Sequence, residues 1–184
     1  MRLYAGGGIL NRFLSEENIA LHLEYVRDKR LKYSIIESSF PMLSGKSVHD
    51  VFRMKLNPRD KLDAVDLLSE IKLHDIFFSS FSKTQYPRCR EIEEKYGSEA
   101  EFLNSLYRLA SSRAHGFALV YLHGTRIEID ATSDYPSAFR IGQPVLAIDI
   151  CEHSYFMDYG FDKERYLISM LPYLDITKLS ANSE

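Results

Sequence analysis

The segment that most constrains the fold is a short apolar run that ends on a carboxylate and an imidazole. Residues 145–150 have the sequence Val-Leu-Ala-Ile-Asp-Ile and follow Gly-Gln-Pro, a pattern that predicts a buried strand entered through a turn. Asp149 lies near its end, and His153 follows four residues later. Side chains at this spacing, leaving the end of a strand, can converge on one point, as metal ligands do. The alternative interpretation is a strand and a turn with an incidental histidine.

Two helical stretches in the first half of the chain each carry a histidine on their apolar face. The first begins after Ser15, the expected N-cap, and has two acidic residues in its first turn, where the helix dipole favours negative charge. His22 lies on its apolar face, and His74 lies on that of the second stretch, residues 60–81. We therefore expect an antiparallel helical hairpin with both histidines inward, although each alone could be a hydrogen-bonded core residue. The apolar positions are Ile19, Leu23 and Val26 in the first helix, and Leu67, Ile71 and Phe78 in the second.

The second half of the chain predicts a mixed α/β unit. A linker at residues 82–89, which contains a proline, suggests a boundary between an N-terminal helical hairpin domain (1–84) and a C-terminal α/β domain (85–184). Beyond it we expect an α+β arrangement with a three-stranded antiparallel sheet. The expected helices are 90–96, 99–113 with a Ser98/Glu101 capping box, and 162–174, and the expected strands are 116–122, 126–131 and 145–150.

Composition argues against several classes of partner. With 23 basic and 26 acidic residues the net charge is −3, so nothing demands a nucleic acid or a membrane surface. No apolar run approaches the length of about 18 residues that a membrane-spanning helix needs. Two cysteines do not form a disulfide framework, and the first ten residues have no continuous apolar segment typical of a secretory signal. We expect a cytoplasmic protein with reduced thiols.

Taken in order, these segments resemble the iron/manganese superoxide dismutases, of which the chain would be a divergent member. Residues 149–155, Asp-Ile-Cys-Glu-His-Ser-Tyr, are similar to the family's Asp-x-Trp-Glu-His-x-Tyr. His22 lies where the family's Ser-x-Glu-x-x-x-x-His has its histidine, and His74 matches the histidine of Asn-His-x-x-Phe/Tyr-Trp. Further matches are the Leu-Ser-Gly-Lys-Ser of residues 43–47 and the Tyr-Gly-Ser of residues 96–98. An ordered set of matches carries more weight than any one motif.

The resemblance implies a metal centre and an activity. His22, His74, Asp149 and His153 would bind one iron or manganese ion per chain. The protein would convert superoxide to oxygen and hydrogen peroxide as the metal alternates between its +2 and +3 states. It would form a homodimer in which Glu152 of one subunit hydrogen-bonds His153 of the other. Two alternatives stay open: a non-dismutase metalloprotein on this fold, and an interaction module whose histidines bind nothing.

Departures from the family pattern fall around the expected site. The family has a tyrosine eight residues after its first ligand, and Arg30 stands there, so Tyr25 or Tyr33 could replace it. Glu70 stands where the iron type has glutamine, and the manganese type's alternative position, around Ser133, holds no glutamine either. The metal's identity therefore stays open.

We expect Arg30, Glu70 and Tyr155 to be catalytic residues. An ionised Glu70 near the metal would stabilise the +3 state and lower the reduction potential. The basic run that contains Arg27, Lys29, Arg30 and Lys32 could attract a small anion. Cys151, which replaces a family tryptophan, is either a packed small hydrophobe or a reactive thiol.

Overall fold

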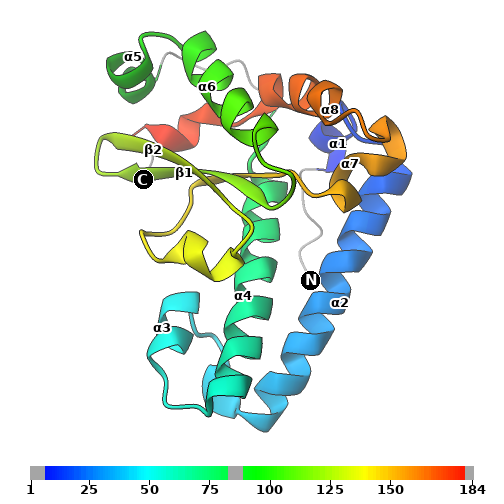
Figure 1. Ribbon diagram of the computed structural model, residues 1–184, viewed down its shortest axis with the longest axis vertical. Helices are drawn as coiled ribbons and strands as arrows, with labels where there is room; N and C mark the ends of the chain where they lie inside the picture. Colours follow the sequence, from blue (N-terminus) through cyan, green and yellow to red (C-terminus); the bar gives the residue numbers. More distant parts are fainter. Residues whose placement is uncertain (1–6, 83–88, 181–184) are drawn as a thin grey trace.

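Two long helices lie antiparallel to each other, one along an edge of the molecule and one through its middle (Figure 1). The structure, a computed structural model, describes residues 7–82 and 89–180, so the expected domain boundary at residues 84 and 85 lies outside the described residues. Helices α2 (Glu16–Ser39) and α4 (Pro58–Ser79) run side by side in opposite directions, which confirms the helical hairpin (Figure 1). A short helix, α1 (Gly7–Leu10), precedes them near the start of α2.

Local capping explains where these helices begin. The Ser15 hydroxyl accepts a hydrogen bond from the Asn18 amide at 3.1 Å, as the sequence predicted. Asn57 caps α4 in the same way, and Pro58 occupies the first turn, where its missing N–H costs nothing. Between the two helices lie a 3₁₀ turn, η1 (Pro41–Leu43), and the short helix α3 (Val48–Arg53), which packs beside α4.

The second half has the expected three-stranded antiparallel sheet. Strands β1 (Phe117–His123), β2 (Arg126–Thr132) and β3 (Leu146–Asp149) lie in the order β2-β1-β3, with β1 paired to both neighbours. Helices α5 (Arg90–Tyr96) and α6 (Glu99–Ser111) lie at the end of the molecule beyond the sheet (Figure 1). The α+β fold class is confirmed.

The C-terminal segment differs from the expectation in two places. A helix that the sequence did not predict, α7 (Glu152–Tyr159), begins three residues after β3 ends. The expected helix 162–174 stops early as α8 (Lys163–Met170), followed by the 3₁₀ turns η3 (Leu171–Tyr173) and η4 (Ile176–Leu179). Pro172 explains the stop, because proline has no N–H to continue the hydrogen bonds of the helix.

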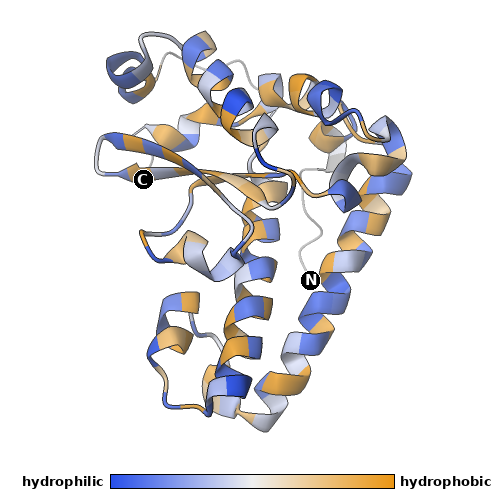
Figure 2. Ribbon diagram, viewed as in Figure 1, coloured by the Kyte–Doolittle hydropathy of each residue, from blue (hydrophilic) through white to orange (hydrophobic). Residues whose placement is uncertain are grey.

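One large apolar core joins the helices to the sheet. The first five residues of β1 are buried, and they belong to the same cluster as Phe77 and Phe78 of α4. The Ser80 hydroxyl, at the end of α4, accepts a hydrogen bond from the Ala147 amide of β3 at 2.9 Å. This contact fixes β3 against α4. Figure 2 shows apolar residues along the strands and on α4, whereas α2 carries many polar residues.

Helix length and hydropathy also bear on membrane crossing. Among residues 7–82 and 89–180, no helix combines the length and apolar character that a bilayer crossing requires.

Candidate metal centre

The structure brings the four predicted ligands together from four different elements. His22 comes from α2, His74 from α4, Asp149 from the end of β3 and His153 from α7, and one ligand atom of each lies within 4.8 Å of the others. The Asp149 Oδ2 atom lies 3.2, 3.3 and 3.0 Å from the Nε2 atoms of His22, His74 and His153 respectively. Three imidazole nitrogens and one carboxylate oxygen therefore face a common point.

Asp149 is held from several sides. Its backbone pairs with Phe117 of β1, and its backbone carbonyl accepts a hydrogen bond from the buried Tyr166 hydroxyl at 3.0 Å. Its Oδ1 atom accepts from the Cys151 amide at 2.9 Å, which leaves Oδ2 directed at the three histidines. A carboxylate fixed in this way needs little reorganisation to bind an ion.

The hydrogen bonds of His74 indicate its tautomer. Its Nδ1 atom lies 2.7 Å from the backbone carbonyl of Glu70, which can only accept, so Nδ1 carries the proton. The Nε2 atom then has a lone pair available for a metal, as in many protein sites where the second ring nitrogen is bound to a carbonyl.

His22 gives a further test of whether a metal fits. The residue is buried, and neither of its ring nitrogens has a hydrogen-bond partner among the described residues. Although its Nε2 atom lies 3.2 Å from Asp149 Oδ2, the direction does not suit a hydrogen bond. An unsatisfied buried polar atom is costly, and an ion at the common point would satisfy Nε2. A set of three imidazoles and one carboxylate suits iron or manganese, so the donor set fits the group that the resemblance implies.

The cluster changes the proton affinities of its members. Burial would raise the pKa of Asp149, but the surrounding His153, His22 and His74 outweigh it and hold that pKa well below its usual range. Burial lowers the pKa of His22, which keeps its imidazole neutral. Burial also lowers the pKa of His153, but the charge and hydrogen bond of Asp149 outweigh that and raise it overall. The arrangement thus favours an ionised carboxylate, the form that binds a metal.

The centre is closed on three sides and open at His153. The side chains of His22, His74 and Asp149 are at most 1% exposed, whereas that of His153 is 28% exposed. Phe77 and Phe78 pack against the His22 ring with centroid distances of 5.2 and 4.9 Å, and Phe117 packs against His74. A small molecule would therefore approach on the side where α7 carries His153.

A tyrosine and an ion pair lie beside this opening. The Tyr25 ring stacks on His153 with a centroid distance of 4.3 Å, and its hydroxyl donates to Glu70 Oε1 at 2.5 Å. The other carboxylate oxygen of Glu70 lies 2.8 Å from Lys29 Nζ. Of the two tyrosines that the sequence left open, Tyr25 lies at the cluster, whereas Tyr33 packs against the smaller core around Leu43 and Val51.

The three residues expected to be catalytic lie in different places. Glu70 is buried and touches the cluster through its backbone and through Tyr25. Arg30 is exposed and forms an ion pair with Asp75. Tyr155 is buried in the core, where its ring stacks on Tyr166 at 4.9 Å. The catalytic roles stay predictions, and of the three only Glu70 lies in the immediate surroundings of the ligands.

The sequence indicated Lys29 only as part of a basic run, but in the structure Lys29 lies beside the candidate ligands. Positions 22, 25 and 29 are three and four residues apart on α2 and therefore share one helical face. The same periodicity that indicated His22 could have placed Tyr25 and Lys29 beside it. Their contact with Glu70 on α4 required the packing of the two helices.

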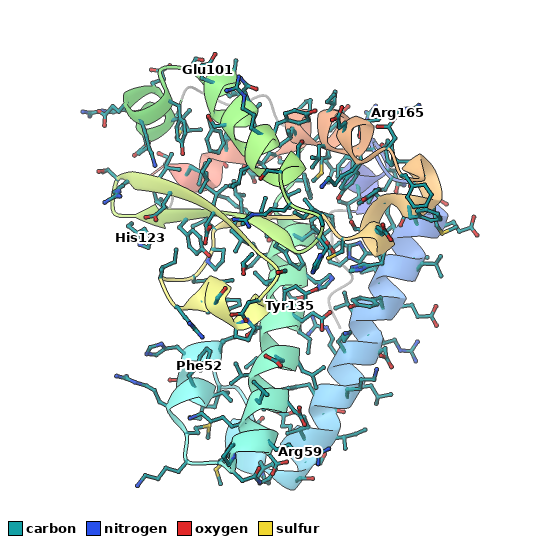
Figure 3. The ribbon with its side chains drawn as sticks, viewed as in Figure 1. Phe52, Arg59, Glu101, His123, Tyr135 and Arg165 are labelled. Carbon is teal, nitrogen blue, oxygen red and sulfur yellow. The ribbon has the colours of Figure 1, made fainter. Side chains whose placement is uncertain are left out.

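Cys151 behaves as a packed thiol. Its Sγ atom accepts a hydrogen bond from the Gly116 amide at 3.2 Å and lies 3.8 Å from the hydroxyl of Tyr135, a residue of the 3₁₀ turn η2 (Tyr135–Phe139) beside α4 (Figure 3). Burial raises the pKa of the Cys151 thiol to about 12. Because a thiol reacts as its thiolate, this favours the packing role over the reactive one.

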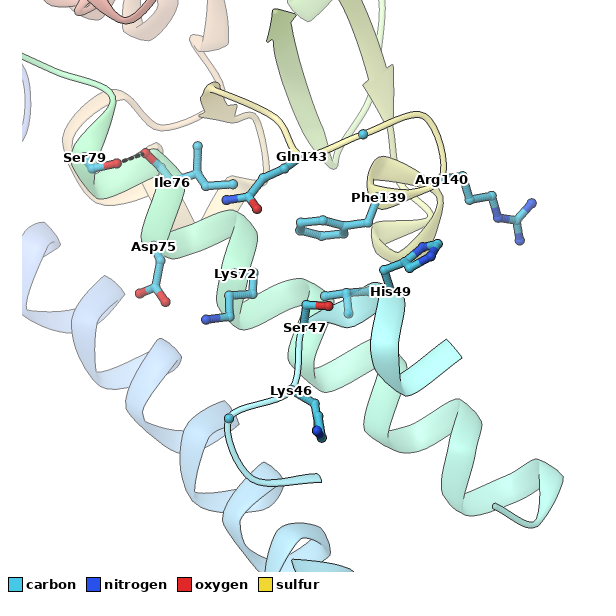
Figure 4. A pocket seen from close by; sticks show the side chains of 13 residues that line it. Lys46, Ser47, His49, Lys72, Asp75, Ile76, Ser79, Phe139, Arg140 and Gln143 are labelled. Atoms are coloured by element: carbon cyan, nitrogen blue, oxygen red, sulfur yellow. Dashed lines mark hydrogen bonds between the residues drawn. The ribbon is translucent and has the colours of Figure 1, made fainter. Parts of the chain in front are cut away.

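A separate cleft lies away from the cluster. It has a volume of about 680 Å³ and is bounded by the start of α3, by α4 and by residues 139–143 (Figure 4). Lys46 and Arg140 line it, but their side chains point in different directions. None of the four candidate ligands contributes to its lining.

The fold and the cluster define a candidate mononuclear metalloprotein. The family described as iron/manganese superoxide dismutases, C-terminal domain, matches residues 85–182, more than half of the chain. The chain belongs to the iron/manganese superoxide dismutase family.

Individual relatives are distant. A superoxide dismutase [Mn/Fe] of Rickettsia bellii is 31% identical over 80 residues, which cover 42% of this chain and 38% of the relative. A superoxide dismutase [Fe] of Babesia bovis is 32% identical over 88 residues, 45% of this chain and 44% of the relative. A chloroplastic superoxide dismutase [Fe] 3 of Arabidopsis thaliana is 23% identical over 142 residues, 72% of this chain and 54% of the relative. The chain thus spans about half the length of the curated relatives it matches.

Proposed function

We propose that the protein is a superoxide dismutase that uses one iron or manganese ion held by His22, His74, Asp149 and His153. The observation that carries the proposal is the convergence of three Nε2 atoms and one Oδ2 atom within 4.8 Å, in a chain of this family. An iron or manganese ion bound there would supply one-electron exchange with superoxide in both directions, which yields oxygen and hydrogen peroxide.

The protein's own residues would set the charge at the entrance and limit access. Superoxide is an anion, and Lys29, whose side chain is 22% exposed, lies beside the open side of the cluster, where it pairs with Glu70. The Lys29 charge offsets that carboxylate, which would otherwise repel an anion. Phe77, Phe78 and Phe117 close the other sides, so bulk water is excluded from His22 and His74.

A positioned hydrogen-bond donor is the second contribution of these residues. The Tyr25 ring stacks on His153, and its hydroxyl is hydrogen-bonded to Glu70. Burial and the neighbouring Glu70 raise the pKa of Tyr25, so its phenol stays protonated at neutral pH, and the two protons that peroxide formation consumes would come from solvent rather than from ionisation of Tyr25. Glu70, paired with Lys29, would orient that O–H.

The test combines metal content with turnover. The purified chain, loaded separately with iron and with manganese, should hold one equivalent of metal and accelerate superoxide decay, followed directly by stopped-flow absorbance. Free metal at the same concentration in the same buffer is the control. One bound equivalent without acceleration for either metal would rule out the dismutase.

A non-dismutase metalloprotein is the second candidate. The observation that favours it is the buried Glu70, a carboxylate that stands where the family's iron type has a neutral amide. On this alternative, the protein binds its metal with the same four residues but does not turn over superoxide.

We further propose a symmetric homodimer, as the resemblance implies. Glu152 is exposed on α7 directly beside His153, the only one of the four ligands with substantial exposure. In such a dimer Glu152 would accept a hydrogen bond from the imidazole of His153 of the partner subunit, which would make that histidine a stronger metal ligand. Phe156 and Met157, on the same helix, are 46% and 49% exposed and would gain burial.

A further inference from the structure

Glu70 and Lys29 form a nearly buried ion pair between the two long helices. Their Oε2 and Nζ atoms are 2.8 Å apart, and the side chains are 7% and 22% exposed respectively. A carboxylate so far removed from water is costly unless a cation compensates it. Lys29 supplies that cation from the neighbouring helix, so the pair as a unit carries no net charge.

Glu70 contacts the ligand cluster through its side chain and through its backbone. Its Oε1 atom accepts the Tyr25 hydroxyl at 2.5 Å, and the Tyr25 ring stacks on His153. The backbone carbonyl of Glu70 accepts a hydrogen bond from the Nδ1 atom of His74 at 2.7 Å. The Lys29 ammonium also lies 4.8 Å from the centroid of the Tyr25 ring, within range of a cation–π contact. Lys29, Glu70 and Tyr25 therefore form one connected network against two of the four ligands.

This network changes what Glu70 alone would do. A lone carboxylate beside the cluster would stabilise the oxidised ion and lower its reduction potential. With Lys29 at 2.8 Å, the negative charge is opposed at short range in surroundings of low dielectric constant, where such opposition is strongest.

We propose that Lys29 is a positioning residue that pairs with Glu70 to form a neutral unit. Glu70 orients the Tyr25 hydroxyl, and the Lys29–Glu70 pair and Tyr25 together take the place of the family's neutral amide. The inference rests on the proposed function to the extent that a redox-active ion occupies the cluster. It predicts that the two charges balance, so that removing one changes the ion's potential and removing both restores it.

The test is a comparison of reduction potentials for the iron-loaded protein, measured by equilibrium redox titration. In E70Q the Lys29 charge is unopposed, and the potential should rise by at least about 59 mV, a tenfold change in a one-electron equilibrium. In the double variant E70Q/K29M the potential should return to within a threefold change of the wild-type equilibrium. A double variant that remains shifted as far as E70Q, or an E70Q without any shift, would overturn the proposal.

Lys32 offers a matched control. It lies on the same helix and pairs with Asp28 at 2.7 Å, but both side chains are more than half exposed. Lys32→Met removes the same charge from the solvent-facing side and should leave the potential unchanged. Lys29→Arg, which keeps the charge and can still reach Glu70, should keep the wild-type potential.

A measurement on the metal-free protein tests the pair independently of redox chemistry. Lys29→Met should reduce the folding equilibrium constant at least tenfold more when Glu70 is present than in the E70Q background, because only the former leaves a buried charge unpaired. If Lys29→Met has the same effect on folding with Glu70 as in the E70Q background, Lys29 does not stabilise Glu70. If the variants show the expected potentials but the protein does not turn over superoxide, the dismutase function is wrong and the Lys29–Glu70 proposal holds. If the protein turns over superoxide but the variants have the wild-type potential, the Lys29–Glu70 proposal is wrong and the dismutase function holds.

Discussion

Gly116 is the residue whose identity the backbone restricts most strictly. Its φ is +109°, and a Cβ atom there would lie 2.1 Å from the backbone oxygen of Thr132. Its carbonyl accepts from the Ile150 amide at 3.0 Å, and its amide donates to Cys151 Sγ. Gly116 thus ties the start of β1 to the residues that directly follow Asp149.

Gly116→Ala should destabilise the fold by about 3 kcal/mol, since it adds a backbone clash to an unfavourable φ. Urea unfolding would measure the change. Gly124→Ala is the matched control, because Gly124 also has a positive φ, +62°, but no atom lies within 4 Å of the added Cβ. It should cost about 1 kcal/mol. Equal losses at both positions would show that the close approach at Gly116 carries no energy.

His74→Ala should abolish metal retention. The residue is fully buried, its Nδ1 atom is occupied by the Glu70 carbonyl, and its Nε2 atom faces the cluster. Elemental analysis after dialysis should find most of the metal lost, while circular dichroism reports the fold. His115→Ala, at an exposed histidine outside the cluster, should keep its full metal content. A His74→Ala protein with one full equivalent would disprove this ligand set.

At the scale of elements, α7 is fixed to the first turn of α2. The Asp158 Oδ2 atom accepts hydrogen bonds from the Ser15 amide and from Asn18 Nδ2, each at 2.9 Å. Burial would raise the pKa of Asp158, but these hydrogen bonds outweigh it and lower that pKa overall. Because α7 carries His153 and α2 carries His22, this junction sets the relative position of two candidate ligands.

Asp158→Asn should therefore destabilise the protein at neutral pH, by at most about 1 kcal/mol because Asp158 is exposed to solvent. The folded-state pKa is depressed, so the stabilisation is complete above the unfolded-state pKa of about 3.9 and is lost as pH falls through the folded value. Melting temperatures of the two proteins, measured from pH 7 downwards, should differ at neutral pH and converge in acid. A difference that stays constant down to pH 2.5 would contradict the mechanism.

At the scale of the whole molecule, the open side of the cluster coincides with an exposed part of α7. His153 is partly exposed, and Glu152, Phe156 and Met157 on the same helix are exposed. A partner subunit docked there would cover apolar side chains and bring a carboxylate to the one accessible ligand.

Light scattering should accordingly find a dimer at micromolar concentration. Glu152→Ala should shift the equilibrium towards monomer and weaken metal retention together, because the same carboxylate would serve both. Glu164→Ala, at an exposed glutamate on α8, is the control and should change neither. A monomeric wild-type protein would remove the dimer proposal, and a dimer insensitive to Glu152→Ala would place the interface elsewhere.

The sequence by itself determined the local structure that carries three of the four candidate ligands, whereas the helix α7 that carries His153 was not predicted. Apolar spacings of three and four placed His22 and His74 on buried helical faces, and the Ser15 cap fixed where the first helix begins. The apolar run of residues 116–122 and the alternation of residues 126–131 gave the β1–β2 hairpin, and the run before Asp149 gave β3. These features depend on neighbours a few residues apart, so periodicity and capping suffice to predict them.

Only the tertiary structure decided how those ligands meet and what surrounds them. The contact of Glu70 with Lys29 and Tyr25 joins residues about forty positions apart, and it exists because α2 packs against α4. From the sequence, Glu70 was an isolated charge expected to lower the potential, whereas in the fold it is half of an ion pair. Arg30, which sequence position favoured, instead pairs with Asp75. Electrostatic energies depend on distance and burial, and packing between helices sets both.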